Sequence, residues 1–263
     1  MHRTQSGQIL LITLLALAIA TTIGLGIIGR SSTDVSISNR VEESARAFSA
    51  AEAGIEQAFL EGQDIPAGTV LTPGVTYQVN VTTLGGSGNY QFPQKTQVNN
   101  VETLWLATYD SETGTFSDPF VGDTLVLCWS QEAVVPAVVV SIFYQEGTEI
   151  KVTRGAYDPA SRSNSFDPVG PPANGCGQTQ VFKQQISLAA LDTPLMMRIA
   201  PVYSSTQFFV NPKGKELPLQ GTRVESEGVT STGVTRKIVA FQEYKTPSII
   251  FDSVIYTPGS FTK

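Results

Sequence analysis

An uncharged apolar run near the N-terminus is the strongest pattern in this sequence. It extends from Ile9 to Ile28, and its polar side chains are the hydroxyls of Thr13, Thr21 and Thr22. At about 1.5 Å per residue, a helix of this length spans roughly 30 Å, the thickness of the hydrocarbon core of a bilayer. A backbone in lipid must satisfy its own hydrogen bonds, so we expect a helix whose threonine hydroxyls bond back to its carbonyl groups.

The helical pattern continues beyond the apolar run. No proline occurs between Asp34 and Leu60, and Gly54 is the only glycine in that interval. Apolar residues recur there at steps of three or four, which is typical of an amphipathic helix that covers a surface with one face. The predicted apolar stripe consists of Ile37, Val41, Ala45, Phe48, Ala51, Ile55 and Phe59.

The predicted helix ends at Gly62, because glycine is a frequent C-cap and Pro66 follows shortly after it. We therefore predict one helix over residues 8–61. Its first part, residues 9–28, is apolar on all sides and forms a membrane span or the core of an assembly. Its second part, residues 34–61, is amphipathic and needs a surface to cover, for which the rest of the chain is the nearest candidate.

The remaining residues, 62–263, have the composition of β structure. Segments rich in Val, Ile, Thr, Phe and Tyr alternate with turns rich in Gly, Pro, Asn and Asp. The predicted fold class is α+β, a long N-terminal helix packed on a large antiparallel β-rich domain, with two lobes as an alternative. A Pro-rich stretch over 157–178 is either a surface loop or a lobe boundary, and 230–233 is a hairpin turn. The predicted strands are 76–84, 103–109, 124–130, 134–144, 149–153, 180–188, 196–203, 206–210, 222–229, 234–242 and 248–256.

Charge and cysteine content fit an extracellular surface. Charged residues make up 15% of the chain and the formal net charge is −6. No long Lys/Arg run exists, which disfavours nucleic-acid binding. Cys128 lies in a predicted strand and Cys176 in the Pro-rich stretch. Outside the cytosol the two can form a disulfide that stabilises the fold by roughly 4 kcal/mol; the alternative is one buried thiol and one unrelated cysteine.

The residues that most enzymes use are scarce. The only histidine is His2, so no Ser–His or Cys–His pair and no histidine-based metal site is expected in the β region. Phosphate-binding glycine motifs are absent. We therefore expect a protein that is not an enzyme and that needs no cofactor. Asp110, Glu112 and Asp118 could supply oxygen ligands for calcium, but they miss the EF-hand spacing, and a polar turn is the alternative.

The junction before the apolar run resembles a known processing signal. A short segment, 1–7, carries the positive residue Arg3 and ends in Gly7, and the apolar helix starts directly afterwards. This arrangement is similar to the class III signal of type IV prepilins. The resemblance implies that 1–7 is a prepilin leader. It further implies that a prepilin peptidase cuts between Gly7 and Gln8 and that the new N-terminus at Gln8 is methylated.

A second resemblance lies in the amphipathic part of the helix. The segment Ala47–Ile55, with the sequence AFSAAEAGI, and the opening segment Gly7–Leu15 are similar to PilX-type minor pilins, so the resemblance covers about residues 1–60. It implies a single-pass protein of the cytoplasmic membrane whose C-terminal domain lies outside. It also implies later assembly with major and minor pilin subunits through the N-terminal helix, followed by display at the cell surface for initiation of the filament or adhesion.

Two positions depart from the pattern of major pilins. Gln8 stands where a phenylalanine is usual, and Ile12 stands where major pilins carry a glutamate that meets a neighbour's N-terminal amine. A buried unpaired charge is costly, so that glutamate works as an assembly register. A subunit with Ile12 has no such acid, which favours a minor or tip subunit over a shaft subunit.

Alternatives to a minor pilin remain open. The first is a pseudopilin of type II secretion. The second is a secreted β domain with an ordinary signal peptide, because Ala18-Ile-Ala20 fits its cleavage pattern. The third is an enzyme or receptor domain anchored by an uncut helix. The mature N-terminus separates these possibilities. It falls at Gln8 for a pilin or pseudopilin, at Thr21 for a secreted domain and at Met1 for a domain with an uncut anchor.

Overall fold

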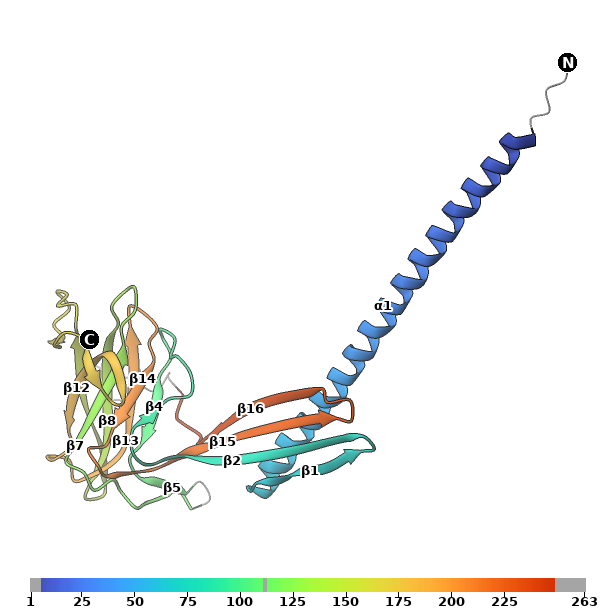
Figure 1. Ribbon diagram of the computed structural model, residues 1–263. Helices are drawn as coiled ribbons and strands as arrows, with labels where there is room; N and C mark the ends of the chain where they lie inside the picture. The colour runs from blue at the N-terminus through green and yellow to red at the C-terminus, as the bar shows by residue number, and fades with distance from the viewer. Residues whose placement is uncertain (1–5, 111–112, 249–263) are drawn as a thin grey trace, which may run out of the picture. The chain divides into compact units, whose positions relative to one another are not determined.

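The computed structural model describes residues 6–110 and 113–248, and these residues form one helix and sixteen strands (Figure 1). The α+β class is confirmed: one long N-terminal helix packs on antiparallel β structure. The chain divides into two compact units. The helix unit comprises residues 1–81 and 224–240, and the sandwich unit comprises residues 82–223 and 241–263.

Helix α1 runs without a break from Ser6 to Glu61, which confirms the predicted long helix. It ends because Gly62 adopts a left-handed conformation with φ of 69°. The amide of Gly62 donates a hydrogen bond of 2.8 Å to the carbonyl oxygen of Ala58. This bond satisfies one of the carbonyl groups that a helix end leaves free, and glycine adopts the conformation without strain.

The helix unit holds a four-stranded sheet with the order β1-β2-β15-β16. The turn over 230–233 joins β15 to β16, and the Thr230 amide donates to the Val234 carbonyl oxygen at 3.0 Å, so the predicted hairpin is confirmed. The sheet therefore combines strands from early and late parts of the chain. Their bounds are Ile65–Thr72 (β1), Val75–Ser87 (β2), Glu216–Thr230 (β15) and Thr235–Glu243 (β16).

The face that α1 turns toward this sheet is made of small residues. The predicted stripe of larger apolar residues was mostly wrong as a buried face: Ala51 is fully buried and Ile55 packs partly on the core, whereas Phe48 and Val41 are 46% and 63% exposed. The physical reason is that large side chains of the sheet, among them Tyr77 and Val79, fill the space under the helix, so that α1 has room there mainly for small residues. The buried positions of α1, spaced by three or four residues, are Ala47, Ala50, Ala51, Gly54 and Ala58.

Two glycines set the distance of this approach. A methyl group on Gly228 of β15 would overlap the carbonyl oxygen of Ala47 and lie 2.8 Å from the amide nitrogen of Ala51. On the helix side, a methyl group on Gly54 would overlap Ser226 Oγ. Since neither site leaves room for a Cβ atom, the backbone of α1 lies directly against β15.

Polar contacts hold the next turn of α1 against the β15–β16 hairpin. Thr232 donates to Glu43 Oε2 at 2.8 Å, and Arg236 Nε donates to Ser44 Oγ at 2.8 Å. The hydroxyls of Thr230 and Thr232 lower the pKa of Glu43, with a smaller contribution from Arg46. These bonds fix the rotation of α1 on the sheet at the level where its small-residue face begins.

The sandwich unit contains two five-stranded sheets, with the orders β10-β9-β8-β13-β4 and β11-β12-β7-β14-β3. Among the described pairings the β9–β10 pair alone is parallel. A two-stranded ribbon, β5 with β6, completes the unit. The bounds are Tyr90–Gln91 (β3), Glu102–Trp105 (β4), Thr108–Asp110 (β5), Thr115–Ser117 (β6), Thr124–Ser130 (β7), Ala137–Glu146 (β8), Glu149–Asp158 (β9), Asp167–Pro168 (β10), Ala173–Gly175 (β11), Gln178–Ser187 (β12), Thr193–Val202 (β13) and Phe208–Asn211 (β14).

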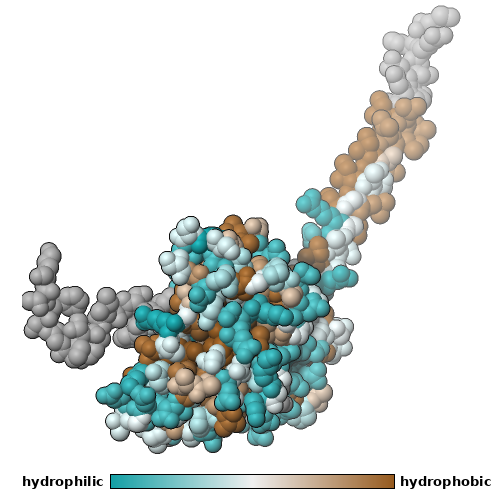
Figure 2. All heavy atoms as spheres, turned by 90° about the vertical axis from the view of Figure 1, so that its left-hand side faces the viewer, coloured by the Kyte–Doolittle hydropathy of each residue, from teal (hydrophilic) through white to brown (hydrophobic). Residues whose placement is uncertain are grey.

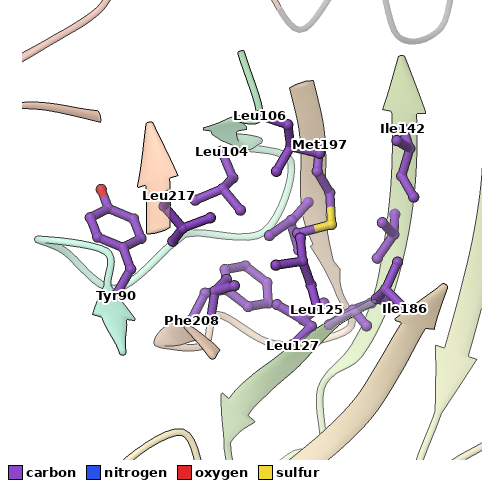
Figure 3. Close-up of a cluster of buried hydrophobic side chains, with 14 of the residues drawn as sticks. Tyr90, Leu104, Leu106, Leu125, Leu127, Ile142, Ile186, Met197, Phe208 and Leu217 are labelled. Carbon is purple, nitrogen blue, oxygen red and sulfur yellow. The ribbon is translucent and has the colours of Figure 1, made fainter. Parts of the chain in front are cut away.

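One hydrophobic core lies between the two sheets of the sandwich unit. Side chains of β8 and β13 from one sheet and of β7, β12 and β14 from the other point toward one another (Figure 3). Alternation along β7, β8 and β14 places every second residue of these strands in this core. Its largest fully buried members include Trp129, Phe92, Phe208, Leu104, Leu106, Leu125, Leu127 and Met197.

Several predicted strands differ from the observed ones. The predicted strand 103–109 is interrupted, because residues 106–107 separate β4 from β5. The Pro-rich stretch over 157–178 lies inside the sandwich unit and contributes the short strands β10 and β11. Strand β1 was missed because it contains a proline and a glycine and is mostly exposed. Most of the predicted strand 248–256 lies outside the described residues.

The close approach of α1 to β15 predicts the effect of one added methyl group. Gly228→Ala should lower the free energy of unfolding of the full-length protein in detergent by about 1–3 kcal/mol, because the methyl group pushes the helix away from the sheet. Denaturant unfolding followed by circular dichroism measures this change. The matched control is Gly24→Ala in α1, where a methyl group would have nothing within 4 Å. An unchanged unfolding midpoint for Gly228→Ala would show that the contact does not hold the unit together.

Candidate functional site

The apolar half of α1 is the first candidate, because it has no protein partner within the described chain. Leu11, Leu14 and Leu25 are 68%, 62% and 71% exposed. Among the described residues, α1 is the one helix that is long and apolar enough to cross a membrane, and its most apolar stretch is wholly unburied. Figure 2 shows this stretch as a continuous apolar surface along the upper helix. An apolar surface of this extent needs lipid or other chains around it.

The polar groups of this half are satisfied within the helix. Thr13 donates to the carbonyl oxygen of Leu10 at 2.9 Å, and Thr22 donates to that of Ala18 at 2.6 Å. Thr21 likewise bonds back to the preceding turn at 2.9 Å. The predicted pattern of threonine bonding is therefore confirmed. Because these hydroxyls need no outside partner, the segment can enter an apolar environment without leaving a polar group unpaired.

The residues of the proposed processing site lie at the start of this helix. Gly7 and Gln8 belong to the first turn of α1, whereas residues 1–5 lie outside the described part of the chain. Ile12 follows one turn after Gln8 and is 59% exposed. The position that carries an acid in major pilins therefore presents an apolar side chain on the surface of the helix.

The structure brings the two cysteines together. Cys128 of β7 and Cys176, just after β11, form a disulfide with a Cα–Cα distance of 6.2 Å. Both are buried, and they pack with Val181 and Phe209 in a small cluster separate from the main core. The disulfide thus fastens the end of the Pro-rich stretch to the outer face of a sandwich sheet.

The calcium candidates are used in local turns. Asp110 accepts hydrogen bonds from the amide of Thr113 at 3.4 Å and from its hydroxyl at 2.7 Å. Asp118 accepts one from Ser117 Oγ at 3.1 Å, and Glu112 lies outside the described residues. Within the described chain no group of three His, Cys, Asp or Glu side chains is placed to hold a metal ion.

A pair of glutamates, Glu102, which is half-buried, and Glu243, which is exposed, was not predicted from the sequence. Glu102 of β4 and Glu243, at the end of β16, line one small pocket with Phe241. Burial raises the pKa of both carboxyl groups, and the charge of Glu243 raises that of Glu102 further, while a 3.0 Å hydrogen bond from Thr96 opposes this. Nothing in the sequence signals the pair, because about 140 residues separate its members.

A buried charge in the sandwich unit was also not predicted from the sequence. Asp158, which is 1% exposed, accepts hydrogen bonds from Arg162 at 2.8 Å, Asn164 at 2.7 Å and the amide of Ala160 at 2.8 Å. Burial alone raises the pKa of Asp158, but these three donors outweigh it and hold the pKa below its ordinary value. The guanidinium of Arg162 also lies over the ring of Tyr203 at 4.3 Å. The network anchors the loop after β9.

Comparison with known proteins returned no match, either among models of protein families or among curated sequences. The functional assignment therefore depends on the geometry of α1 and on the residues of the N-terminal segment. The sandwich unit, with its disulfide and pockets, supplies a second and separate set of features.

The disulfide predicts a large effect of reduction. It joins residues 48 positions apart, and a loop of this length stabilises the folded state by about 4 kcal/mol in the chain-entropy description. Reductant should therefore lower the unfolding midpoint of the full-length protein. The control is the double variant Cys128→Ala/Cys176→Ala, which should be less stable and insensitive to reductant. Equal midpoints with and without reductant for the natural protein would contradict the expectation.

The Asp158 network predicts a pH dependence with a defined sign. A lowered carboxyl pKa stabilises the fold above the ordinary aspartate value of about 3.9, and this contribution is lost as the pH falls through the folded-state pKa. Asp158→Asn should lower the free energy of unfolding by about 1–3 kcal/mol near neutral pH, because it removes the carboxylate charge that the three donors stabilise. The decrease should be much smaller in acid, where Asp158 itself is protonated. Denaturant unfolding of the variant and of Asp192→Asn, an exposed control, tests this. A loss that is equal at both pH values would refute the electrostatic explanation.

Proposed function

We propose that this protein is a minor pilin-like subunit of a type IV pilus-like filament. In this proposal α1 holds the newly made chain in the cytoplasmic membrane, a prepilin peptidase cuts after Gly7, and the subunit then enters a filament through its apolar half. The observation that carries the proposal is the division of one continuous helix into two parts. The part around Ala50 packs on the chain's own sheet, whereas the part over 10–28 packs on nothing in the described chain.

The apolar half requires a covering at every stage. Leaving one leucine side chain in water instead of burying it costs roughly 2 kcal/mol, and this segment carries many large apolar residues. A bilayer covers it first, and the helices of other subunits cover it after assembly. Gly24, Gly26 and Gly29 have nothing within 4 Å, so another helix can approach the backbone closely there.

A minor or tip position follows from the same segment. Ile12 provides no carboxylate to meet a neighbour's N-terminal amine in an apolar core. A subunit without this acid makes no such ion pair with its neighbour, which is acceptable at an end or at a rare position but not along a repeating shaft. The sandwich unit, which the proposal places outside the membrane, then lies on the cell surface, where adhesion is a suitable role. A secretion pseudopilin is the alternative within the same class.

Cleavage by an ordinary signal peptidase after Ala20 fits the structure less well. It would leave the mature chain with an apolar N-terminus on a helix that has no partner there. Ile23, Leu25 and Ile27 are 58%, 71% and 65% exposed. A soluble secreted protein with this end would tend to associate through it.

Mass spectrometry of the mature N-terminus tests the proposal directly. We expect a chain that begins at Gln8 and carries an N-methyl group. Gly7→Ala should abolish the cut and leave the full-length protein in the membrane fraction, absent from sheared filaments. The matched control, Gly26→Ala, changes a helix glycine with nothing within 4 Å and should be processed normally.

Three results would contradict this expectation. A mature N-terminus at Thr21 would identify a secreted protein, and an intact Met1 in cells with an active prepilin peptidase would identify a permanent anchor. Filaments that still contained the Gly7→Ala variant would show that the cut is not needed for assembly.

A further inference from the structure

The outer face of one sandwich sheet carries a polar pocket that the membrane and filament roles do not use. In this sheet Val126 of β7 pairs with Gln185 of β12 on one side and with Asn211 of β14 on the other. Neighbouring Lys183 pairs with Cys128. Alternate residues of a strand point to opposite faces, so these side chains lie on the face away from the main core.

These residues line a pocket of about 420 Å³. Val126 contributes an apolar side chain, and the amides of Gln185 and Asn211 stand beside it on the neighbouring strands. A second side of the pocket comes from β11 and the residue after it. The residues that line the pocket are Val126, Asn174, Gly175, Cys176, Lys183, Gln185, Asn211 and Lys213.

The charge of this pocket is opposite to that of the chain. The protein has a formal net charge of −6, yet the lining contains two lysines and no acidic residue. Elsewhere in the described chain, Lys95, Lys151 and Lys237 are each paired with a glutamate. Among the described residues neither Lys183 nor Lys213 makes an ion pair. Two unneutralised ammonium groups at one concave site favour an anionic ligand.

The amide groups add hydrogen-bonding capacity to this charge. The Asn211 Oδ1 atom accepts a hydrogen bond of 2.7 Å from the amide of Lys213, which leaves the Asn211 NH₂ group as a donor. Asn174 and Gln185 offer further donors and acceptors. Such a set of neutral amides suits the hydroxyl groups of a sugar, whereas the ammonium groups suit a carboxylate.

The disulfide holds one side of the pocket in place. Cys176 is bonded to Cys128, and a methyl group on Gly175 would lie 3.1 Å from Cys128 Sγ and 3.5 Å from the Cδ atom of Lys183. The segment that carries Asn174 is therefore packed tightly against the sheet. Because the other side chains stand on paired strands, the pocket is formed before any ligand arrives.

We propose that this pocket binds an acidic saccharide, a sugar unit that carries a carboxylate. Lys183 and Lys213 contact the carboxylate, the three amides contact hydroxyl groups, and Val126 packs against the ring. The volume accommodates one or two sugar units. This site lies within the sandwich unit alone, so it does not depend on the role of α1, and failure of either proposal leaves the other standing.

Titration calorimetry of the full-length protein in detergent tests the proposal with glucuronic acid as the probe. We expect saturable binding of glucuronate, and weaker binding of glucose, which lacks the carboxylate. Lys183→Gln/Lys213→Gln should weaken glucuronate binding at least about tenfold, since two hydrogen bonds to a charged group are lost. The control Lys245→Gln changes a lysine that does not line this pocket and should bind as the natural protein does.

Reduction of the disulfide should also weaken binding, because it frees the segment that carries Asn174. Both lysines are exposed, so the double variant should unfold at the same denaturant concentration as the natural protein; if it does not, the two single variants replace it, each with a smaller decrease. Three results would overturn the proposal. These are no saturable binding of glucuronate, equal binding by the lysine variants, and binding of inorganic phosphate as tight as that of glucuronate, which would indicate a simple anion site.

Discussion

The helix unit depends on one close approach, that of the α1 backbone to strand β15. Gly54 and Gly228 leave no room for a Cβ atom at the contact, and the alanines around them keep the separation small. At this contact α1 contributes mainly alanine and glycine, while large side chains of the sheet, such as Tyr77 and Val79, fill the rest of the core. The polar bonds from the β15–β16 hairpin to Glu43 and Ser44 then fix the helix's rotation, so that the same small face meets the sheet along its length.

This choice of face determines what α1 presents to its surroundings. Because alanine and glycine fill the internal face, the larger residues, such as Val41 and Phe48, remain outside it. The helix unit therefore folds mainly on the small residues of α1, with Ile55 as a partly buried large one. The large apolar residues of the first part of the helix, over 10–28, are left for lipid or for other chains. This separation supports the proposal of an assembly function.

The sequence was sufficient to predict features that depend on residues close together in the chain. The length of α1, its end at Gly62 and strand β7 follow from composition, periodicity and turn residues that are adjacent in the chain. The buried face of α1 was not predictable in this way. Phe48 is more hydrophobic than Ala47, but the space against the sheet admits the small side chain of Ala47 and not that of Phe48. Sheet order, the Glu102–Glu243 pair and the lysine-lined pocket depend on contacts between distant segments, about which local periodicity carries no information.

The order of the chain adds a last constraint on how the helix unit forms. Its sheet takes β1 and β2 from before residue 88 and β15 and β16 from after residue 215, with most of the sandwich unit between them. The surface that covers Ala47 and Gly54 includes Gly228 and Ser226 and so is incomplete until late in the chain. Loop closure over this span costs less when the intervening residues are already compact, because only the effective loop length counts. The sheet on which α1 packs is thus complete only when β2 and β15, from distant parts of the chain, have paired, so the packing of the helix depends on residues far from it in sequence.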